Sequence, residues 1–128
     1  MAGMLYLDTH VVVWLYEKDE ARLAGRPMEL IEENDLLVSP IVLLELEYLY
    51  ETKRIAETGR VIVDELAERV QLRVCPRAFV DVIRRAAGIR WTRDPFDRIV
   101  TAQAALLDAM LLTKDGDIHT HYPNAVWQ

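Results

Sequence analysis

Residues 36–50 read LLVSPIVLLELEYLY and contain a short apolar segment that leads directly into a helix start signal. Residues 36–38 are apolar and end in a β-branched side chain, which favours a buried strand. Ser39 supplies an N-cap hydroxyl and Pro40 suits the first helical position, so a helix is predicted over residues 40–54. A strand followed at once by a helix is the building unit of a parallel α/β sheet.

The same alternation continues on both sides of this segment. Further strands are predicted at residues 4–7, 72–75, 110–113 and 125–127, and further helices at residues 10–18, 27–33, 58–68, 77–87 and 95–108. We therefore expect a three-layer α/β/α sandwich with a mostly parallel sheet of four to five strands.

Composition sets the class of protein. A chain of 128 residues with 52% hydrophobic and 28% charged residues suits a single globular domain over residues 1–128. No charge-free stretch reaches the roughly 18 residues that span a bilayer, so no membrane insertion is expected. The lone Cys75 and the absence of a leader pattern favour the cytoplasm. The net charge of −6 argues against a broad basic RNA-binding face, unless clustered acids bind cations.

Acidic residues follow two of the predicted strands. Asp8 comes directly after residues 4–7, and Asp115 and Asp117 come shortly after residues 110–113. In an open parallel sheet, ligands bind outside the carboxyl ends of the strands. These acids are candidate site residues, although helix capping by Asp8 and an Asp-Gly turn explain the same positions.

Glu45 lies on the inward face of the helix predicted after Pro40. Its neighbours three and four residues away are all apolar: Ile41, Val42, Tyr48 and Leu49. An ionised carboxylate on such a face is unfavourable by several kcal/mol unless a cation or hydrogen-bond donors meet it. A metal ion would meet this need, as would a buried salt bridge with an arginine or partial exposure of the helix face.

Asp94 and Asp97 open another predicted helix in the string RDPFDR. Asp94 is the expected N-cap, and Asp97 falls in the first turn, where the helix dipole favours acids. Small residues on the face of Asp97 let this helix approach the sheet end. Four separate segments then bring acids to one edge of the sheet, and divalent cations are the usual compensation for such clustered charge.

Four strings in order, LDTH, VSPIVLLELEYL, TRDPFDRIVTAQA and LLTKDGDI, resemble the PIN-domain family, in particular its VapC-type toxin branch. The resemblance spans nearly the whole chain. It implies an endoribonuclease that depends on Mg²⁺ or Mn²⁺, acts as the toxin of a type II toxin-antitoxin pair, binds a cognate antitoxin protein and often forms a homodimer. The catalytic residues that it implies are Asp8, Glu45, Asp97 and Asp115, with Asp117 as an alternative fourth acid, and the metal ligands are Asp8, Asp97, Asp115 and Asp117.

An acidic ribonuclease still needs contacts to RNA. Residues 84–98 carry a local excess of arginines, among which we expect Arg93 and Arg98 to bind phosphates. Thr9 and Thr113 are expected to add hydroxyl contacts to the substrate. The apolar stretch 43–50 suggests a homodimer contact.

Two other readings remain open. A phosphoryl-accepting α/β domain also has acids at strand ends, but a receiver carries paired acids after its first strand, and a haloacid-dehalogenase-like phosphatase carries a second Asp two residues after the first. Here Asp8 is followed by Thr9 and His10. A non-catalytic interaction module, whose acidic pocket docks an arginine-rich partner, is the second alternative.

Overall fold

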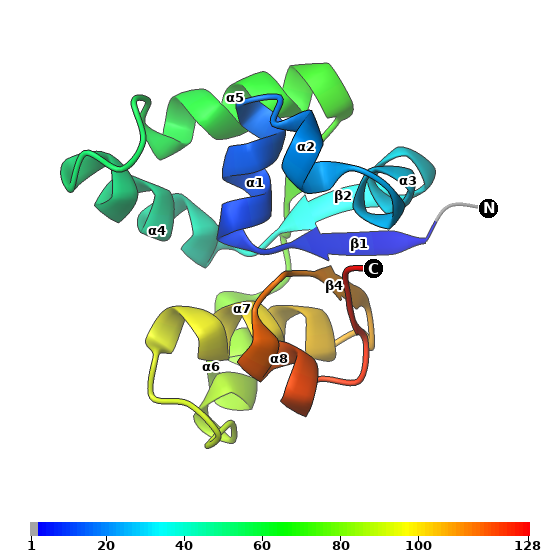
Figure 1. The fold of residues 1–128 in the computed structure, drawn as a ribbon. Coiled ribbons are helices and arrows are strands. Elements are labelled where there is room, and N and C mark those ends of the chain that lie inside the picture. The colour runs from blue at the N-terminus through cyan, green and yellow to red at the C-terminus, as the bar shows by residue number, and fades with distance from the viewer. Residues whose placement is uncertain (1–2) are drawn as a thin grey trace.

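A computed structural model describes residues 3–128 and contains a five-stranded sheet in which every neighbouring pair is parallel (Figure 1). The strand order is β3-β2-β1-β4-β5. Their bounds are β1 Met4–Leu7, β2 Asp35–Val38, β3 Arg73–Val74, β4 Met110–Leu112 and β5 Ala125–Val126. The parallel α/β sheet expected from the sequence is confirmed.

Eight helices occur among the described residues. They are α1 Thr9–Tyr16, α2 Glu20–Leu23, α3 Arg26–Glu33, α4 Pro40–Glu51, α5 Gly59–Val70, α6 Phe79–Ala87, α7 Pro95–Ala105 and α8 Gly116–His121. Six match predicted helices, with ends that differ by no more than three residues. The short helices α2 and α8 were not predicted, because four or six residues are too few to show helical periodicity.

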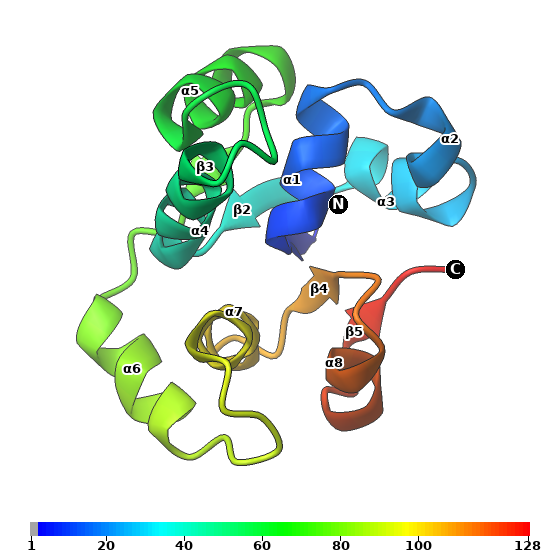
Figure 2. The same cartoon turned by 60° about the vertical axis from the view of Figure 1, so that its left-hand side comes forward.

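The helices cover both faces of the sheet. Figures 1 and 2 show α1, α2, α3 and α5 on one side and α6, α7 and α8 on the other. Helix α4 contacts α1, α5 and α7, so it joins the two helical layers. The core is built on the central strand β1, where Leu5, Tyr6 and Leu7 are at most 2% exposed. No helix within residues 3–128 is long and apolar enough to cross a membrane.

The contact between α4 and α5 requires a glycine at the start of α5. A Cβ atom on Gly59 would lie 2.9 Å from the carbonyl oxygen of Leu43 and 3.0 Å from Cβ of Leu46. The Gly59 N–H donates to Oε1 of Glu47 at 2.8 Å. These contacts pack the start of α5 against α4, the helix that carries Glu45.

Candidate functional site

Asp8 lies at the carboxyl end of the central strand and is 6% exposed. Its Oδ1 accepts the backbone N–H of Thr9 at 2.8 Å, which caps α1. Its Oδ2 accepts the hydroxyl of Thr113, which follows β4, at 2.6 Å. Because β1 and β4 are parallel neighbours, their ends meet and these two side chains come together.

The side chain of Glu45, in the middle of α4, contacts Thr9, the residue that follows Asp8. Its Oε1 accepts the hydroxyl of Thr9 at 2.5 Å. Burial raises the pKa of Glu45, the Thr9 hydrogen bond partly opposes this, and the negative charges of Asp8 and Asp94 raise it further. Within residues 3–128 no lysine or arginine forms an ion pair with Glu45. The buried salt bridge considered from the sequence is therefore absent from this part of the chain.

The pKa of Asp97 indicates that acids from several segments lie near one another. Burial raises its pKa to about 7, and repulsion from four other acids adds to the rise. In decreasing order these are Asp94, Asp115, Asp8 and Glu45. The Asp97 carboxylate accepts no hydrogen bond from the described part of the chain, whereas Asp94 caps α7 by accepting the N–H of Phe96 at 2.8 Å. Asp97 is therefore a half-buried acid surrounded by like charge and without a donor.

The structure distinguishes the two candidates for the fourth acid. Asp115 is the N-cap of α8, where Oδ1 accepts the N–H of Ile118 at 3.0 Å, and its own N–H donates to the hydroxyl of Thr113 at 3.0 Å. Asp117 is exposed in the first turn of α8 and does not influence the pKa of Asp97. Asp115 thus lies in the cluster with Asp97, and Asp117 does not.

Both predicted threonines hold acids in place. The side chains of Thr9 and Thr113 are buried, and their hydroxyls donate to Glu45 and Asp8, respectively. In this structure the two hydroxyls orient carboxylates. The expected contacts of Thr9 and Thr113 to the substrate stay a prediction.

His10 and Lys114 adjoin the acids and were not singled out from the sequence. Nδ1 of His10 lies 3.6 Å from Oδ2 of Asp8, and its Nε2 accepts the N–H of Lys114 at 3.0 Å. Burial lowers the pKa of His10, the charges of Asp8 and Asp115 oppose this, and Lys114 lowers it further. The available signal was local, because His10 follows Asp8 by two residues and Lys114 immediately precedes Asp115.

The predicted phosphate-binding arginines form no ion pair with the acids in the described part of the chain. The guanidinium of Arg98 donates to the carbonyl oxygens of Ala86 and Ala87, both at 3.2 Å. It thereby provides hydrogen-bond donors for two carbonyl groups at the end of α6. Arg93 and Arg98 line a separate hollow of about 210 Å³. The reason is helical geometry, because Arg98 projects about 100° around α7 from Asp97.

The cluster suits Mg²⁺ or Mn²⁺ by the chemistry of its donors. It supplies hard carboxylate oxygens, and no lysine or arginine within residues 3–128 pairs with them. No three acidic, histidine or cysteine side chains of these residues are close enough to hold an ion directly. Mg²⁺ commonly keeps several waters and takes only one or two protein carboxylates, so the arrangement fits a partly hydrated ion.

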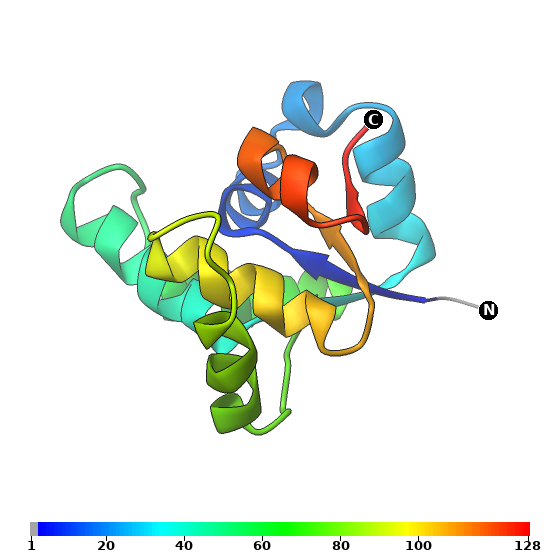
Figure 3. The same ribbon diagram turned by 90° about the horizontal axis from the view of Figure 1, so that it is seen from below.

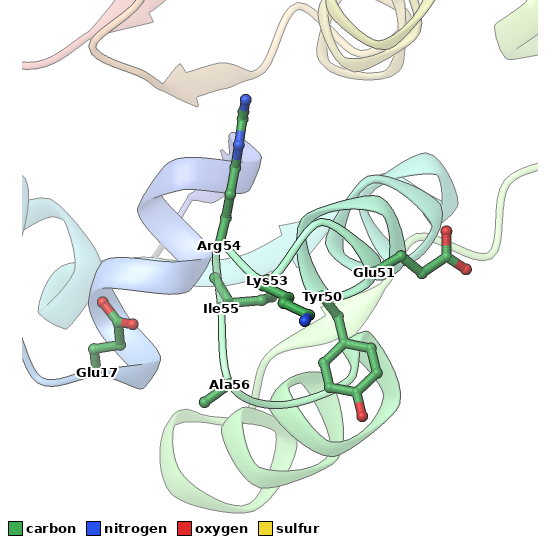
Figure 4. Close-up of a pocket in the computed structure, with 7 residues that line it drawn as sticks. All are labelled: Glu17, Tyr50, Glu51, Lys53, Arg54, Ile55 and Ala56. Atoms are coloured by element: carbon green, nitrogen blue, oxygen red, sulfur yellow. The ribbon is translucent and has the colours of Figure 1, made fainter.

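A larger hollow, of about 730 Å³, lies away from these acids (Figure 4). Figure 4 shows it between the end of α1 and the loop that joins α4 to α5, lined by Glu17, Tyr50, Glu51, Lys53, Arg54, Ile55 and Ala56. It contains none of the predicted site residues. The acid cluster is thus identified by its electrostatics and not by a hollow of this kind.

Comparison with known proteins assigns the family. A PIN domain model matches residues 5–122. Ribonuclease VapC22 of Mycobacterium tuberculosis is 31% identical over 128 residues, which cover 94% of this chain and 96% of the relative.

Solved structures share the fold at 19% identity. VapBC2 from Rickettsia felis, bound to a DNA fragment from its promoter, matches with a TM-score of 0.67 over 98% of this chain and 97% of that chain. A toxin-antitoxin complex from Klebsiella pneumoniae matches with a TM-score of 0.63 over 95% of each chain. With a parallel sheet whose ends gather four acids and a family match over most of its length, the chain belongs to the PIN-domain family.

Proposed function

We propose that this protein is a metal-dependent endoribonuclease that hydrolyses RNA phosphodiester bonds and acts as the toxin of a type II toxin-antitoxin pair. One observation carries the proposal: Asp8, Glu45 and Asp115, which come from three separate segments, all raise the pKa of Asp97. A phosphodiester is an anion, and such an acid cluster can act on it only when a divalent cation offsets the charge.

The relatives support the same proposal. The similar VapC22 is a ribonuclease, and the structures that share the fold include toxin-antitoxin complexes. A cognate antitoxin protein is therefore the proposed partner, and the cytoplasm, where RNA is accessible, is the proposed location.

Asp8, Asp97 and Asp115 are the proposed acids of the Mg²⁺ or Mn²⁺ site, where one or two of them would bind the ion directly and the others would bind it through its waters. When bound, the ion supplies charge neutralisation at the phosphate and a more acidic water. Thr113 holds Asp8 through Oδ2 and Thr9 holds Glu45 through Oε1, so both carboxylates keep fixed orientations. Glu45, whose pKa is raised by burial, is the proposed acceptor of the proton from the attacking water.

A homodimer is the proposed assembly. Leu44, Tyr48 and Tyr50 of α4 are 45%, 48% and 41% exposed, which is high for side chains of this size. Burying them against a second copy would remove apolar surface from water. Sedimentation of the Leu44→Ser/Tyr48→Ser variant as a monomer, with wild type as a dimer, would support this surface.

A phosphoryl-accepting role is less well supported, because Asp8 is followed by Thr9 and His10 and not by the further acid that such domains carry near the end of their first strand. An RNA cleavage assay distinguishes the nuclease from the alternative of a non-catalytic docking module. Purified wild type, Asp8→Asn and Asp64→Asn are incubated with structured RNAs in Mn²⁺, Mg²⁺ or EDTA. Asp64 is an exposed acid on α5 and serves as the matched control.

We expect cleavage by wild type and Asp64→Asn in Mn²⁺ or Mg²⁺, none in EDTA, and none by a folded Asp8→Asn protein. Cleavage that persists in EDTA or in Asp8→Asn would contradict the proposal. A folded wild-type protein that binds an arginine-rich peptide and cleaves no RNA would favour the docking module.

A further inference from the structure

A further cavity, of about 500 Å³, is lined by Lys114, which directly precedes Asp115 in the chain. Figures 2 and 3 show the C-terminal segment passing between α3 and α8. Residues of α3, of α8 and of this segment line the cavity. Its walls include Arg26, Lys114, His119 and Trp127, and no acidic side chain lines it. In a protein of net charge −6, this is a concentration of positive charge.

The positive charges of this cavity are not neutralised by neighbours. Arg26 and Lys114 are exposed, and neither forms an ion pair within residues 3–128. Arg26 is also the first residue of α3, whose N-cap Gly25 provides no side-chain hydrogen bond. Glu29 in the first turn of α3 offsets the partial positive charge of the helix start, so the positive charge of the cavity comes from the two side chains. The cavity is therefore suited to an anion.

Trp127 gives the cavity an aromatic wall with a firm support. Its ring packs edge-on against Trp14 at 5.9 Å, and Trp14 packs against the ring of His10 at 4.9 Å. The guanidinium of Arg22 lies 5.1 Å from the Trp14 ring, on the same aromatic group. A partly exposed and supported tryptophan beside cations is the arrangement on which unpaired bases stack.

The cavity and the acid cluster share residues of one short segment. Lys114 lies between Thr113, which binds Asp8, and Asp115. The ring Nε2 of His119 lies 2.6 Å from the carbonyl oxygen of Thr113. Lys114 and His119 therefore connect the cavity wall to the segment that carries Thr113 and Asp115.

We propose that this cavity binds one nucleotide of the RNA next to the cleaved phosphodiester. Arg26 and Lys114 contact its phosphate, and Trp127 stacks on its base. The inference rests on the proposed function, because it takes RNA as the substrate. It goes further by naming a subsite that favours single-stranded RNA, since a paired base cannot stack on a side chain.

The test measures binding of a fluorescently labelled single-stranded oligoribonucleotide by polarisation, in an Asp8→Asn background, at several salt concentrations. For Arg26→Ala/Lys114→Ala we expect the slope of log affinity against log salt to become shallower by about 0.7, the change for one phosphate of a single strand, because both side chains contact the same phosphate. Trp127→Leu should weaken binding about 5- to 100-fold without changing the slope, and Trp127→Phe should recover most of the loss.

Arg60→Ala is the matched control, because the Arg60 side chain is 90% exposed on α5, away from the cavity. Arg26→Ala/Lys114→Ala and Trp127→Leu proteins that bind RNA like Arg60→Ala would overturn the subsite, even if wild type cleaves RNA. Binding that depends on the cavity, in a wild-type protein that cleaves nothing in Mn²⁺, would keep the subsite and remove the nuclease proposal. Binding of an acidic peptide but of no RNA would overturn the subsite in favour of a protein partner.

Discussion

The hydroxyl of Thr113 donates a hydrogen bond of 2.6 Å to Oδ2 of Asp8, although 105 residues separate them in the chain. Thr113 is fully buried and also accepts the N–H of Asp115 at 3.0 Å. One side chain therefore links the acid after β1 to the acid that begins α8. The arrangement of the cluster depends on this contact between neighbouring strand ends.

Replacing Thr113 with valine should destabilise the protein and reduce RNA cleavage. Valine keeps the shape but leaves Oδ2 of Asp8 buried without its donor, at an expected cost of about 1–3 kcal/mol in the free energy of unfolding. Urea denaturation and cleavage assays of Thr113→Val and Thr113→Ser measure both effects. Serine restores the hydroxyl, so failure of Thr113→Ser to recover activity would argue against the orienting role.

The stability of the metal-free protein should depend on Asp97 between about pH 4 and 7. The folded pKa of about 7 lies above the ordinary value of 3.8, so the folded state holds a proton that the unfolded chain has lost. The stabilising contribution is complete below about pH 4 and disappears as the pH rises through 7. Asp97→Asn removes this titration.

Melting temperatures of wild type and Asp97→Asn in EDTA at pH 5 and pH 8 test this expectation. The advantage of the variant over wild type should be larger at pH 8, where the wild-type carboxylate is charged among other acids. A difference that stays constant between the two pH values would show that Asp97 does not titrate in this range. Asp117→Asn, which changes an exposed acid outside the cluster, is the control.

Mg²⁺ or Mn²⁺ should stabilise the wild-type protein against heat. An ion at about 100 times its dissociation constant raises the free energy of unfolding by about 2.7 kcal/mol if it binds only the folded state. Asp8→Asn and Asp115→Asn should lose most of this gain, and Asp117→Asn should keep it. Equal stabilisation of all these variants would place the ion elsewhere.

Gly59→Ala should destabilise the fold without altering the acids. The added Cβ would lie 2.9 Å from the backbone oxygen of Leu43, so α4 and α5 must separate slightly. We expect a loss of about 1–3 kcal/mol, less any gain from the higher helix propensity of alanine. Denaturation measures the loss, and RNA cleavage below the unfolding transition should stay within about twofold of wild type.

The sequence alone was sufficient to predict the strands, the longer helices and the gathering of acids at one edge of the sheet. The positions of Asp8 and Glu45 follow from local patterns, because apolar runs and N-cap signals specify elements and parallel strands end at a common edge. The order of motifs, from LDTH to LLTKDGDI, was enough to predict the PIN-domain family to which the chain belongs.

The sequence already favoured Asp115 over Asp117, but only the tertiary structure showed the hydrogen bond that joins Asp115 to Thr113 and turned Arg98 toward the end of α6. Sequence spacing gives a residue's position along an element, whereas its direction depends on how the element is rotated and capped against its neighbours. Helix α8 is too short for a periodic signal, and its cap at Asp115 forms through contact with Thr113 after β4. Contacts between segments far apart in the chain therefore decided which hydroxyl each carboxylate oxygen meets, as for Thr113 with Asp8 and Thr9 with Glu45.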